Sequence, residues 1–323
     1  MTPPFTITQS ILNEVAQIER LVGQLEGLQN IKPQPYLRKS NRVRTIHASL
    51  AIEGNTLALD QVTALLDGRK VLGSKNEVQE VLNAIEVYDQ IQRFRPHVLK
   101  DLLKAHRMMM TGLIPTAGKW RSSGVGILKG TAVAHVAPPA HLVPGLMQTL
   151  FDFLKDKEVH PLIKGRVFHY ELEFIHPFAD GNGRIGRFWQ SRLLIQYHRV
   201  FEFIPVESIV KDNQIDYYQA LERSDKTGQS TPFVEFSLSM IRQALEGYLD
   251  ALQPKPLSAK ERVEVARDHF EDKQFSRKDY LKYFKTISTA TASRDLKLGV
   301  DEGWLAKEGE RANTVYSFVK GAA

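Results

Sequence analysis

The residues best suited to chemistry lie in one short segment, between positions 176 and 187. It reads His-Pro-Phe-Ala-Asp-Gly-Asn-Gly-Arg-Ile-Gly-Arg. The Gly-Asn-Gly triplet lets successive backbone N–H groups turn toward one point, just before a predicted helix N-terminus that carries about half a positive charge. Arg184 and Arg187 add two cations on one edge of that helix. The segment therefore suits a phosphate group.

Asp180 and His176 supply groups that can act on a bound phosphate. An unpaired carboxylate at Asp180 would repel phosphate, whereas one bound to Mg²⁺ would bridge it. His176 lies four residues earlier and is placed to take a proton from an incoming hydroxyl. The alternative is a plain turn with a helix cap, a core histidine and solvated arginines. The occurrence of all these residues within twelve positions favours the chemical interpretation.

Other nucleotide-binding motifs fit this segment poorly. Gly181, Gly183 and Gly186 match G-x-G-x-x-G, but a dinucleotide site needs a preceding strand and an acidic residue about 20 positions later. A helical pattern and a His-Pro pair precede these glycines instead. No Lys-Ser or Lys-Thr follows them as in a P-loop, and the kinase motifs are missing from the sequence.

The segment resembles the Fic (Fic/Doc) family signature, His-x-Phe-x-Asp/Glu-Gly-Asn-Gly-Arg-x-x-Arg, with every fixed position present. Fic proteins are helical enzymes that typically transfer AMP from ATP to a hydroxyl of a target protein, with release of pyrophosphate. The resemblance implies that His176 is the general base, that Phe178 anchors the loop and that Asp180 binds Mg²⁺. The ATP-binding residues implied within the signature are Asp180, Gly181, Asn182, Gly183, Arg184, Ile185, Gly186 and Arg187.

Two further segments resemble nucleotide-contacting parts of the family. The stretch from Trp120 to Pro139 looks like the flap hairpin, which is expected to clamp a target segment by strand addition and to cover the nucleotide. The region around residues 217 to 225 looks like the adenine contact, although the family often has Asn at the last position and two core tyrosines would give the same pattern. The implied contacts are Val125, Gly126, Ile127, Leu128, Tyr217, Tyr218 and Asp225.

A carboxylate interrupts an apolar helix face well before the signature. Glu53 continues the series Val43, Ile46 and Leu50, with spacings of three, four and three. Burial and a helix C-terminus both disfavour the ionised form of an acid, so Glu53 must protonate or find a cation. A forked arginine of the proposed phosphate site would satisfy it.

Residues 49 to 54, Ser-Leu-Ala-Ile-Glu-Gly, resemble the family's inhibitory pattern Ser/Thr-x-x-x-Glu-Gly/Asn. The resemblance implies that Ser49, Glu53 and Gly54 form an N-terminal inhibitory element. It also implies that Glu53 pairs with Arg187 and so denies this arginine to the γ-phosphate. The alternative is a surface Glu at a frayed helix end. The preceding basic run, from Lys32 to Arg44, fits a solvated helix face better than a nucleotide attractor.

Apolar periodicity predicts a mainly α-helical fold. A first helix carries Ile11 to Leu25 on one face and ends before Pro33 and Pro35, and a second begins near Ser40 and stops at Gly54. The stretch from Val125 to Pro139 predicts a hairpin. Further helices are predicted over residues 77–94, 96–110, 146–155, 162–175, 184–197 and 231–252.

We expect four regions along the chain: an N-terminal helical region over residues 1–95, a Fic catalytic core over 96–252, a Pro-containing linker over 253–257, and a small domain over 258–323. The small domain resembles a winged helix-turn-helix, in which Thr291–Leu296 would open the recognition-type helix. Its 14 basic and 11 acidic residues leave a net charge of +3 between 255 and 323, which is modest for a phosphate binder. DNA binding, protein docking and target recruitment all stay open.

Composition excludes several classes. The chain has 323 residues, 43 basic against 37 acidic, and no cysteine, which rules out disulfides, Cys-based zinc sites and thiol nucleophiles. It has no stretch of about 20 apolar residues and no secretion signal at its start, so we expect a cytoplasmic protein without a membrane span. The spacing of His47, His106, His135 and His141 builds no metal site, and Met108–Met110 fit core packing.

The function predicted from the sequence is a Mg²⁺-ATP-dependent adenylyltransferase, inhibited by Glu53. It would act on a Ser, Thr or Tyr hydroxyl of a target protein or of itself. Two alternatives stay open: a DNA-binding transcriptional regulator whose Fic core senses nucleotide, and a Fic enzyme that mainly removes AMP. A homodimer also stays open.

Overall fold

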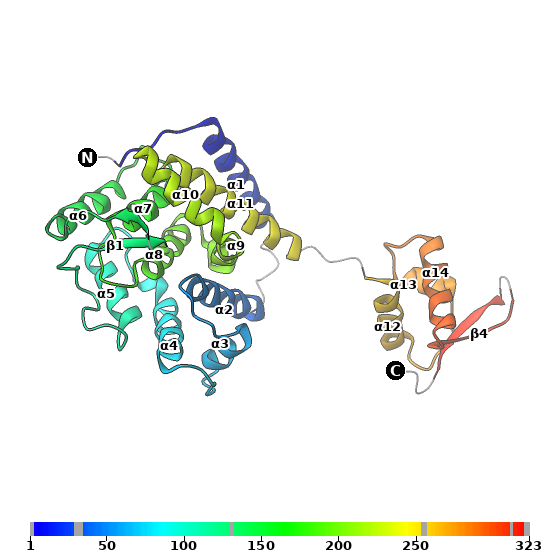
Figure 1. Ribbon diagram of the computed structural model, residues 1–323. Coiled ribbons are helices and arrows are strands. Elements are labelled where there is room, and N and C mark those ends of the chain that lie inside the picture. Colours follow the sequence, from blue (N-terminus) through cyan, green and yellow to red (C-terminus); the bar gives the residue numbers. More distant parts are fainter. Residues whose placement is uncertain (1–2, 29–34, 130–131, 253–256, 311–312, 320–323) are drawn as a thin grey trace. The chain divides into compact units, whose positions relative to one another are not determined.

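The computed structural model describes residues 3–28, 35–129, 132–252, 257–310 and 313–319. The chain divides into two compact units, residues 1–252 and 253–323 (Figure 1). Each unit has its own cluster of buried apolar side chains. Helices dominate, which confirms the predicted fold class. Among the described residues, no helix is both long enough and apolar enough to cross a membrane.

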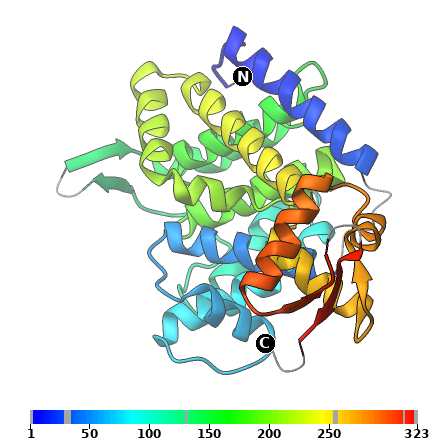
Figure 2. The same cartoon turned by 90° about the vertical axis from the view of Figure 1, so that its right-hand side faces the viewer.

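The first unit begins with a long helix that packs against the last one. α1 (Gln9–Leu28) runs alongside α11 (Thr231–Leu252) (Figures 1 and 2). Ile11, Ile18 and Leu25 of α1 are fully buried, as the spacing predicts. Glu14 and Arg242 form an ion pair between the two helices, with Oε2 and Nε 2.8 Å apart. The N-terminal region is thereby fixed to the rest of the unit.

The helix that carries the predicted inhibitory pattern is α2 (Pro35–Ile52). It begins five residues before Ser40, so the predicted N-cap was wrong. Pro35 was interpreted as the end of the preceding helix. A proline in the first helical turn loses no intrahelical hydrogen bond, so it can also begin a helix. Ile52 is the last helical residue, and Gly54 follows with a φ of 90°, in the left-handed region.

Three helices follow α2: α3 (Leu59–Leu66), α4 (Lys75–Asp89) and α5 (Leu99–Met110). Ser74 caps α4 by accepting a hydrogen bond from the Glu77 N–H. The predicted helices over 77–94 and 96–110 are shorter, because the 3₁₀ turn η1 (Ile91–Arg93) and an extended link interrupt them. α3 was not predicted.

The centre of the unit is the pair α7 (Pro161–Ile175) and α8 (Asn182–Tyr197), which pack against each other and against α11 and α5 respectively. Phe168, Phe188 and Trp189 of this pair are fully buried. The signature segment is therefore the short connection between two core helices. Around the pair lie η2 (Ala140–Leu142), α6 (Val143–Phe153), η3 (Arg199–Phe203), α9 (Val206–Asp212) and α10 (Gln214–Thr227).

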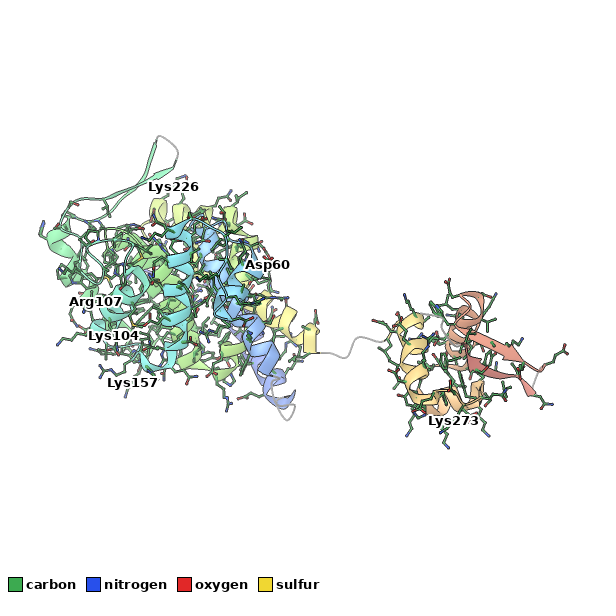
Figure 3. All side chains as sticks on the ribbon, turned by 90° about the horizontal axis from the view of Figure 1, so that it is seen from below. Asp60, Lys104, Arg107, Lys157, Lys226 and Lys273 are labelled. Carbon is green, nitrogen blue, oxygen red and sulfur yellow. The ribbon has the colours of Figure 1, made fainter. Side chains whose placement is uncertain are left out.

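A two-stranded hairpin extends from the body of the first unit (Figures 2 and 3). Its strands β1 (Gly126–Lys129) and β2 (Ala132–Val136) pair antiparallel, with Gly126 opposite Val136 and an irregularity after Ile127. This is the hairpin that the sequence predicts between residues 125 and 139.

The second unit is a small helical bundle against a three-stranded sheet. Its elements are α12 (Ala259–Phe270), β3 (Phe275–Ser276), α13 (Arg277–Tyr283), α14 (Thr289–Asp301), β4 (Leu305–Glu308) and β5 (Val315–Phe318), and the antiparallel strand order is β3-β5-β4. Ser258, Ser276 and Ser288 cap its three helices. Tyr280 and Leu296 lie in its core. Residues 253–256 of the predicted linker lie outside the described residues.

Candidate functional site

His176 lies where the chain reverses after α7. Its backbone is left-handed, with φ 49° and ψ 61°, and its N–H donates to the Leu172 carbonyl at 2.9 Å. Pro177 follows and cannot continue the helix. The imidazole is half-buried, and its Nδ1 lies 3.4 Å from the Glu173 carbonyl oxygen. The helix end thus presents the predicted base at the start of the signature loop.

The side chain of Asn182 closes the signature loop. Its Oδ1 accepts from the Phe178 N–H and its Nδ2 donates to the Phe178 carbonyl, both at 2.9 Å. The Phe178 ring is fully buried and stacks on the His106 ring, with centroids 3.6 Å apart. Asn182 therefore contributes its amide to the shape of the loop, and Phe178 lies where the resemblance places an anchor.

His106 supports the same loop from α5. Its Nδ1 accepts from the Gly118 N–H, so its Nε2 carries the proton and donates to the Asp180 carbonyl at 2.9 Å. Burial lowers the pKa of His106 to about 4, so the ring is neutral near pH 7. The structure thus gives His106 a positioning contact.

α8 begins directly after the loop and directs its N-terminus toward the site. Gly181 has a φ of 82°, and a Cβ there would lie 2.6 Å from the Met110 sulfur. The N–H groups of Asn182, Gly183 and Arg184 belong to the first helical turn, which has no intrahelical acceptors. Together with the helix dipole they form a site suited to an anion.

Glu53 lies against this helix N-terminus. Its Oε1 is 2.6 Å from Arg187 Nη2, and a Cβ at Gly183 would come within 2.3 Å of the same oxygen. Arg187 also donates to the Ser49 hydroxyl and carbonyl, at 3.1 and 2.9 Å. Burial lowers the pKa of Arg187, but the Glu53 carboxylate outweighs it and raises the pKa above its usual value. The Glu53 carboxylate thus lies at the N-terminus of α8, where the N–H groups and Arg187 suit an anion.

The Glu53 side chain is 28% exposed, which is more than its place on an apolar face suggests. Glu53 follows the last residue of α2, so it leaves the buried face and reaches the edge of the site. Gln214 donates to the carbonyl of Ile52 at 3.1 Å and fixes the end of α2 against α10.

A second acid binds the other signature arginine. Arg184 Nη1 lies 2.6 Å from Glu80 on α4, and its Nη2 lies 2.8 Å from Asp180. Glu80 also accepts a hydrogen bond from Asn55 at 2.9 Å, two residues after Glu53. Glu80 was not predicted from the sequence, because it lies on a separate helix and no spacing within the chain connects it to the signature.

Arg121 joins the flap to the catalytic loop. Its Nε donates to the His176 carbonyl at 2.8 Å, and its Nη2 donates to the carbonyls of Ile175 and Pro138. Its Nη1 donates to the Ser123 carbonyl at 2.8 Å. Among the described residues, the acceptors of this buried guanidinium are main-chain carbonyls, on both ends of the flap and on the end of α7. The sequence predicts Arg121 in the flap region but does not predict this role.

Glu173 was also missed. It lies one turn before His176, and a Cβ at Gly186 would meet its Oε1 at 2.8 Å. Burial raises its pKa to about 7, with Arg187 lowering it and Glu53 raising it. No described residue offers Oε1 a hydrogen bond. Its place three residues before the signature histidine is the only sequence signal that points to it.

The remaining predicted nucleotide contacts within the signature and on α10 are largely buried. Ile185 is fully buried in the core, and a Cβ at Gly186 would point at Glu173, so both positions suit close packing. Tyr217 is also buried, with its hydroxyl 3.0 Å from His169 Nε2, whereas Tyr218 is 45% exposed.

The last of the predicted nucleotide contacts are Asp225 and the residues of the flap. Asp225 accepts from the Tyr170 hydroxyl at 2.9 Å. Val125 is half-buried at the start of the flap, and its carbonyl accepts from the Ala137 N–H. The side chains of Gly126, Ile127, Leu128 and His135 lie outside the described residues.

Asp180 is the residue best placed to hold a metal ion. Its carboxylate is 56% exposed and accepts from the Gly181 N–H and from Arg184. Within the described part of the chain, no group of three or more His, Cys, Asp or Glu side chains is arranged to hold a metal. Mg²⁺ commonly takes one or two carboxylates together with substrate phosphates and water. A single accessible carboxylate beside an anion site fits that pattern.

Comparison with known proteins agrees with this geometry. A model of the Fic/DOC family matches residues 96–194. The crystal structure of a Fic family protein from Desulfovibrio desulfuricans G20 is 38% identical and covers 99% of both chains, with a TM-score of 0.76. The chain belongs to the Fic family. Curated relatives named protein adenylyltransferase Fic, from Nematostella vectensis and Aedes aegypti, are each 30% identical over 70% and 69% of this chain.

The Fic chain spans about half the length of these curated relatives, 53% and 46% respectively. The matched family region begins before α5 and ends within α8, so it includes the whole signature loop.

Proposed function

We propose that this Fic protein is a Mg²⁺-ATP-dependent protein adenylyltransferase and that Glu53 holds it in an inhibited state. The observation that carries the proposal is the ion pair between Glu53 and Arg187 at the N-terminus of α8. An arginine and a helix N-terminus suited to phosphate are both engaged by one carboxylate of the same chain. The names of the curated relatives support the activity.

The proposed reaction moves AMP to a Ser, Thr or Tyr hydroxyl of a target protein or of this chain. His176 takes the proton of the attacking hydroxyl as its oxygen bonds to the α-phosphorus, and pyrophosphate leaves as the bond to the bridging oxygen breaks. The first-turn N–H groups of α8 stabilise the phosphate oxygens. Asp180 would hold Mg²⁺, which supplies positive charge between the phosphates when bound. Arg184 and Arg187 bind the outer phosphates.

The proposed inhibition acts through the arginines. Arg187 must exchange Glu53 for a phosphate, and Arg184 must exchange Glu80, before the outer phosphates can be bound productively. The Glu53 carboxylate also places a negative charge beside Gly183, where it repels a phosphate. Asn55 connects Glu80 to the segment after Glu53, so movement of α2 would affect both pairs.

The flap and the second unit are proposed to select the target. A hairpin of two strands leaves outer backbone edges that an extended peptide can pair with. In the second unit, the order helix, strand, two helices and two strands supports a winged helix, with Arg294 and Lys297 exposed on α14. We propose that this unit docks a target protein or DNA.

The proposed chemistry is tested with the full-length Glu53→Gly variant and ATP labelled at either the α- or the γ-phosphate. AMP transfer puts the α-label on protein and leaves the γ-label in pyrophosphate. Adding His176→Ala should abolish α-labelling. Mass spectrometry of the labelled protein then locates the hydroxyl.

Two results would contradict the proposal. Protein-bound γ-label would show a different transfer, and a folded Glu53→Gly variant without any α-label would exclude AMP transfer under these conditions. Salt-sensitive DNA binding in the absence of transfer would favour the regulator instead, and loss of AMP from prelabelled protein would favour the removing enzyme.

A further inference from the structure

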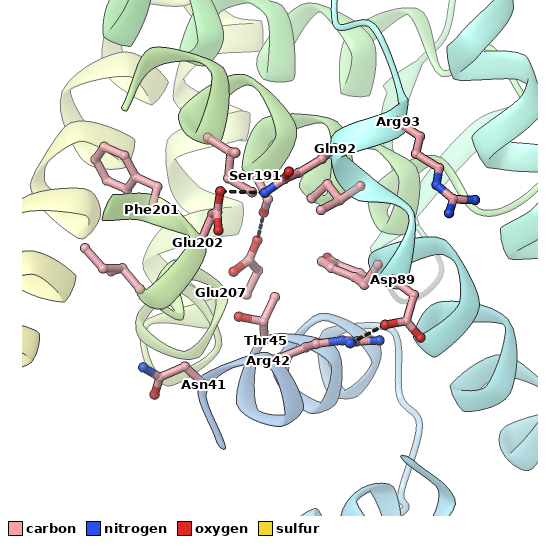
Figure 4. Close-up of a pocket in the computed structure, with 14 residues that line it drawn as sticks. Asn41, Arg42, Thr45, Asp89, Gln92, Arg93, Ser191, Phe201, Glu202 and Glu207 are labelled. Atoms are coloured by element: carbon pink, nitrogen blue, oxygen red, sulfur yellow. Dashed lines mark hydrogen bonds and ion pairs between the residues drawn. The ribbon is translucent and has the colours of Figure 1, made fainter. Parts of the chain in front are cut away.

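A cavity of about 370 Å³ lies away from the signature loop, and no residue of that loop lines it. Its walls come from α2, from α4 and η1, from the C-terminal half of α8, and from η3 and α9 (Figure 4). Its volume falls within the range of pockets that bind small molecules. Two of its walls, α2 and α8, are the helices that the Glu53–Arg187 pair joins.

The polar centre of this cavity is Glu207, in the first turn of α9. Its side chain is 3% exposed and accepts a hydrogen bond from the Ser191 hydroxyl. Among the described residues it forms no ion pair within 4 Å. The charges of two buried arginines, Arg166 and Arg187, reach it from farther away. Arg187 is bound to Glu53, and the guanidinium of Arg166 has no hydrogen-bond partner among the described residues. A carboxylate offers about four acceptor positions, and an unpaired buried carboxylate is costly. Glu207 thus lacks a close cationic partner.

A second polar group lines the same cavity. Tyr88 is 8% exposed, and its hydroxyl lies near Glu207 and Ser191 without a hydrogen bond of normal geometry to any described residue. Figure 4 shows Glu207 between Ser191 and Thr45. These oxygens, on four different elements, can all accept hydrogen bonds.

The charged groups at the border of the cavity are largely engaged with each other. Arg42 forms an ion pair with Asp89, and Gln92 donates to Glu202, as the dashed lines in Figure 4 mark. Arg93 and Glu202 also line the cavity and keep their charges, and Glu207 is the buried charged residue of the lining. Ile91, Ile195 and Phe201 add apolar surface.

We propose that this cavity binds a small organic cation, with a primary ammonium group on Glu207 and an apolar body against Ile91, Ile195 and Phe201. An ammonium group carries three donors, which match Glu207 and the hydroxyls of Tyr88 and Thr45. An anion would be repelled by Glu207. A bare divalent cation would need more oxygen ligands than this single carboxylate and its hydroxyls supply.

The test measures binding of hexylammonium to the full-length protein by isothermal titration calorimetry in phosphate buffer. 1-Hexanol and hexanoate have the same chain with a neutral or an anionic head group. We expect hexylammonium to bind saturably, at least about tenfold more tightly than 1-hexanol, because only the cation pairs with Glu207. Hexanoate should not bind.

Two variants separate Glu207 from general charge effects. Glu207→Gln keeps the size of the side chain and should weaken hexylammonium binding at least about tenfold. Glu202→Gln removes the same charge at the border and should change it less than about twofold. Thermal melts without ligand check that both variants fold.

Three results would overturn the proposal. They are equal binding of hexylammonium to wild type and Glu207→Gln, equal binding of hexylammonium and 1-hexanol, and no saturable heat up to about 10 mM hexylammonium. None of these measurements uses AMP transfer, so the cavity and the proposed function are tested separately.

Discussion

At the scale of single residues, the site depends on which group each carboxylate neutralises. Glu53 binds Arg187 and lies against Gly183, while Glu80 and Asp180 bind Arg184. Both arginines are buried, and Glu53 and Glu80 are partly buried, whereas Asp180 is exposed. Losing a partner costs a buried charge more than it costs a surface charge. Small changes next to Glu53 should therefore have measurable effects.

Replacing Gly183 with Ala should destabilise the first unit by about 1 to 2 kcal/mol. The new Cβ would lie 2.3 Å from Glu53 Oε1, so Glu53 must turn away from Arg187. In a Glu53→Gly background the contact with Glu53 disappears, and the remaining close neighbour, Arg187 Nη1 at 3.0 Å, is the end of a side chain that can then shift. Ala should therefore be neutral or stabilising, because it favours the helix by up to about 1 kcal/mol. Urea unfolding of the four proteins of this double-mutant cycle measures the difference.

Gly165→Ala is the matched control for Gly183→Ala. Gly165 lies inside α7, and a Cβ there would meet Leu193 at an ordinary 3.7 Å. This substitution should have the same neutral or stabilising effect with and without Glu53. If Gly183→Ala likewise changes stability equally in both backgrounds, the carboxylate is not held against Gly183.

Glu173→Gln should stabilise the protein at pH 8 and have no effect at about pH 4. The pKa of Glu173 is raised from its usual 4.5 to about 7, so the folded state binds this proton more tightly than the unfolded state. Its contribution is therefore complete below pH 4.5 and is lost as the pH rises through 7. The difference between variant and wild type should reach at most about 3 kcal/mol in urea unfolding.

Two neighbouring histidines change the stability with pH in the opposite direction to Glu173, so the variant must be compared with wild type at each pH. Burial lowers the pKa of His106 and His169, so their contributions rise with pH in the acidic range. They are the same in wild type and variant. A pH-independent difference between the two proteins would show that Glu173 titrates normally.

The sequence predicts those site residues that lie close together along the chain. The signature places His176, Asp180, Asn182 and Arg187 in one loop and one helix start, which the structure brings together. Glu53 could be linked to Arg187 through a family pattern. Glu80 could not, because its contact with Arg184 depends on how α4 packs against α8, and no local spacing encodes that packing.

At the scale of elements, Arg121 is expected to hold the flap to α7. Arg121→Gln should cost about 2 to 4 kcal/mol, because it leaves buried carbonyls of Ile175, His176 and Pro138 without a donor. Urea unfolding gives the loss, and faster hydrogen exchange at the Ala137 N–H, which donates to the Val125 carbonyl, reports the flap base.

Arg95→Gln is the matched control for Arg121. Arg95 pairs with Asp101 at 3.0 Å, but its side chain is 72% exposed. The Arg95→Gln substitution should destabilise the protein much less than Arg121→Gln, without a change in exchange at Ala137, because exposed ion pairs contribute little. Equal small losses in both variants would refute the structural role of Arg121.

Long helices with sustained apolar periodicity could be predicted, and short helices could not. α10, with 14 residues, was also not predicted, because few of its residues are buried. α1 and α11 carry sustained apolar periodicity, so their core faces are visible in the sequence. α3 and α9 have eight and seven residues, too few for a clear period, and tertiary packing stabilises them. The start of α2 was misplaced because Pro35 ends one helix pattern and begins another.

At the scale of the whole molecule, the two units should unfold separately. Tyr280→Ala removes a fully buried side chain from the core of the second unit and should destabilise that unit by about 3 kcal/mol or more. The midpoint temperature of the unfolding transition of residues 1–252 should not change, because the core of the first unit shares no residue with the core of the second unit. Differential scanning calorimetry resolves the transitions.

Tyr283→Ala is the control for Tyr280. Tyr283 is 39% exposed and stacks on His269, so its loss should cost less than about 1 kcal/mol. If Tyr280→Ala shifts both transitions together, the two units are energetically coupled.

The central claim is that Glu53 limits AMP transfer by holding Arg187. The most direct measurement is the initial rate of α-label incorporation from ATP, compared between wild type and Glu53→Gly at equal protein concentration. Glu53→Gly should be at least about tenfold faster, since it frees Arg187 and removes a negative charge from the phosphate site. Equal rates in the two proteins would contradict the account.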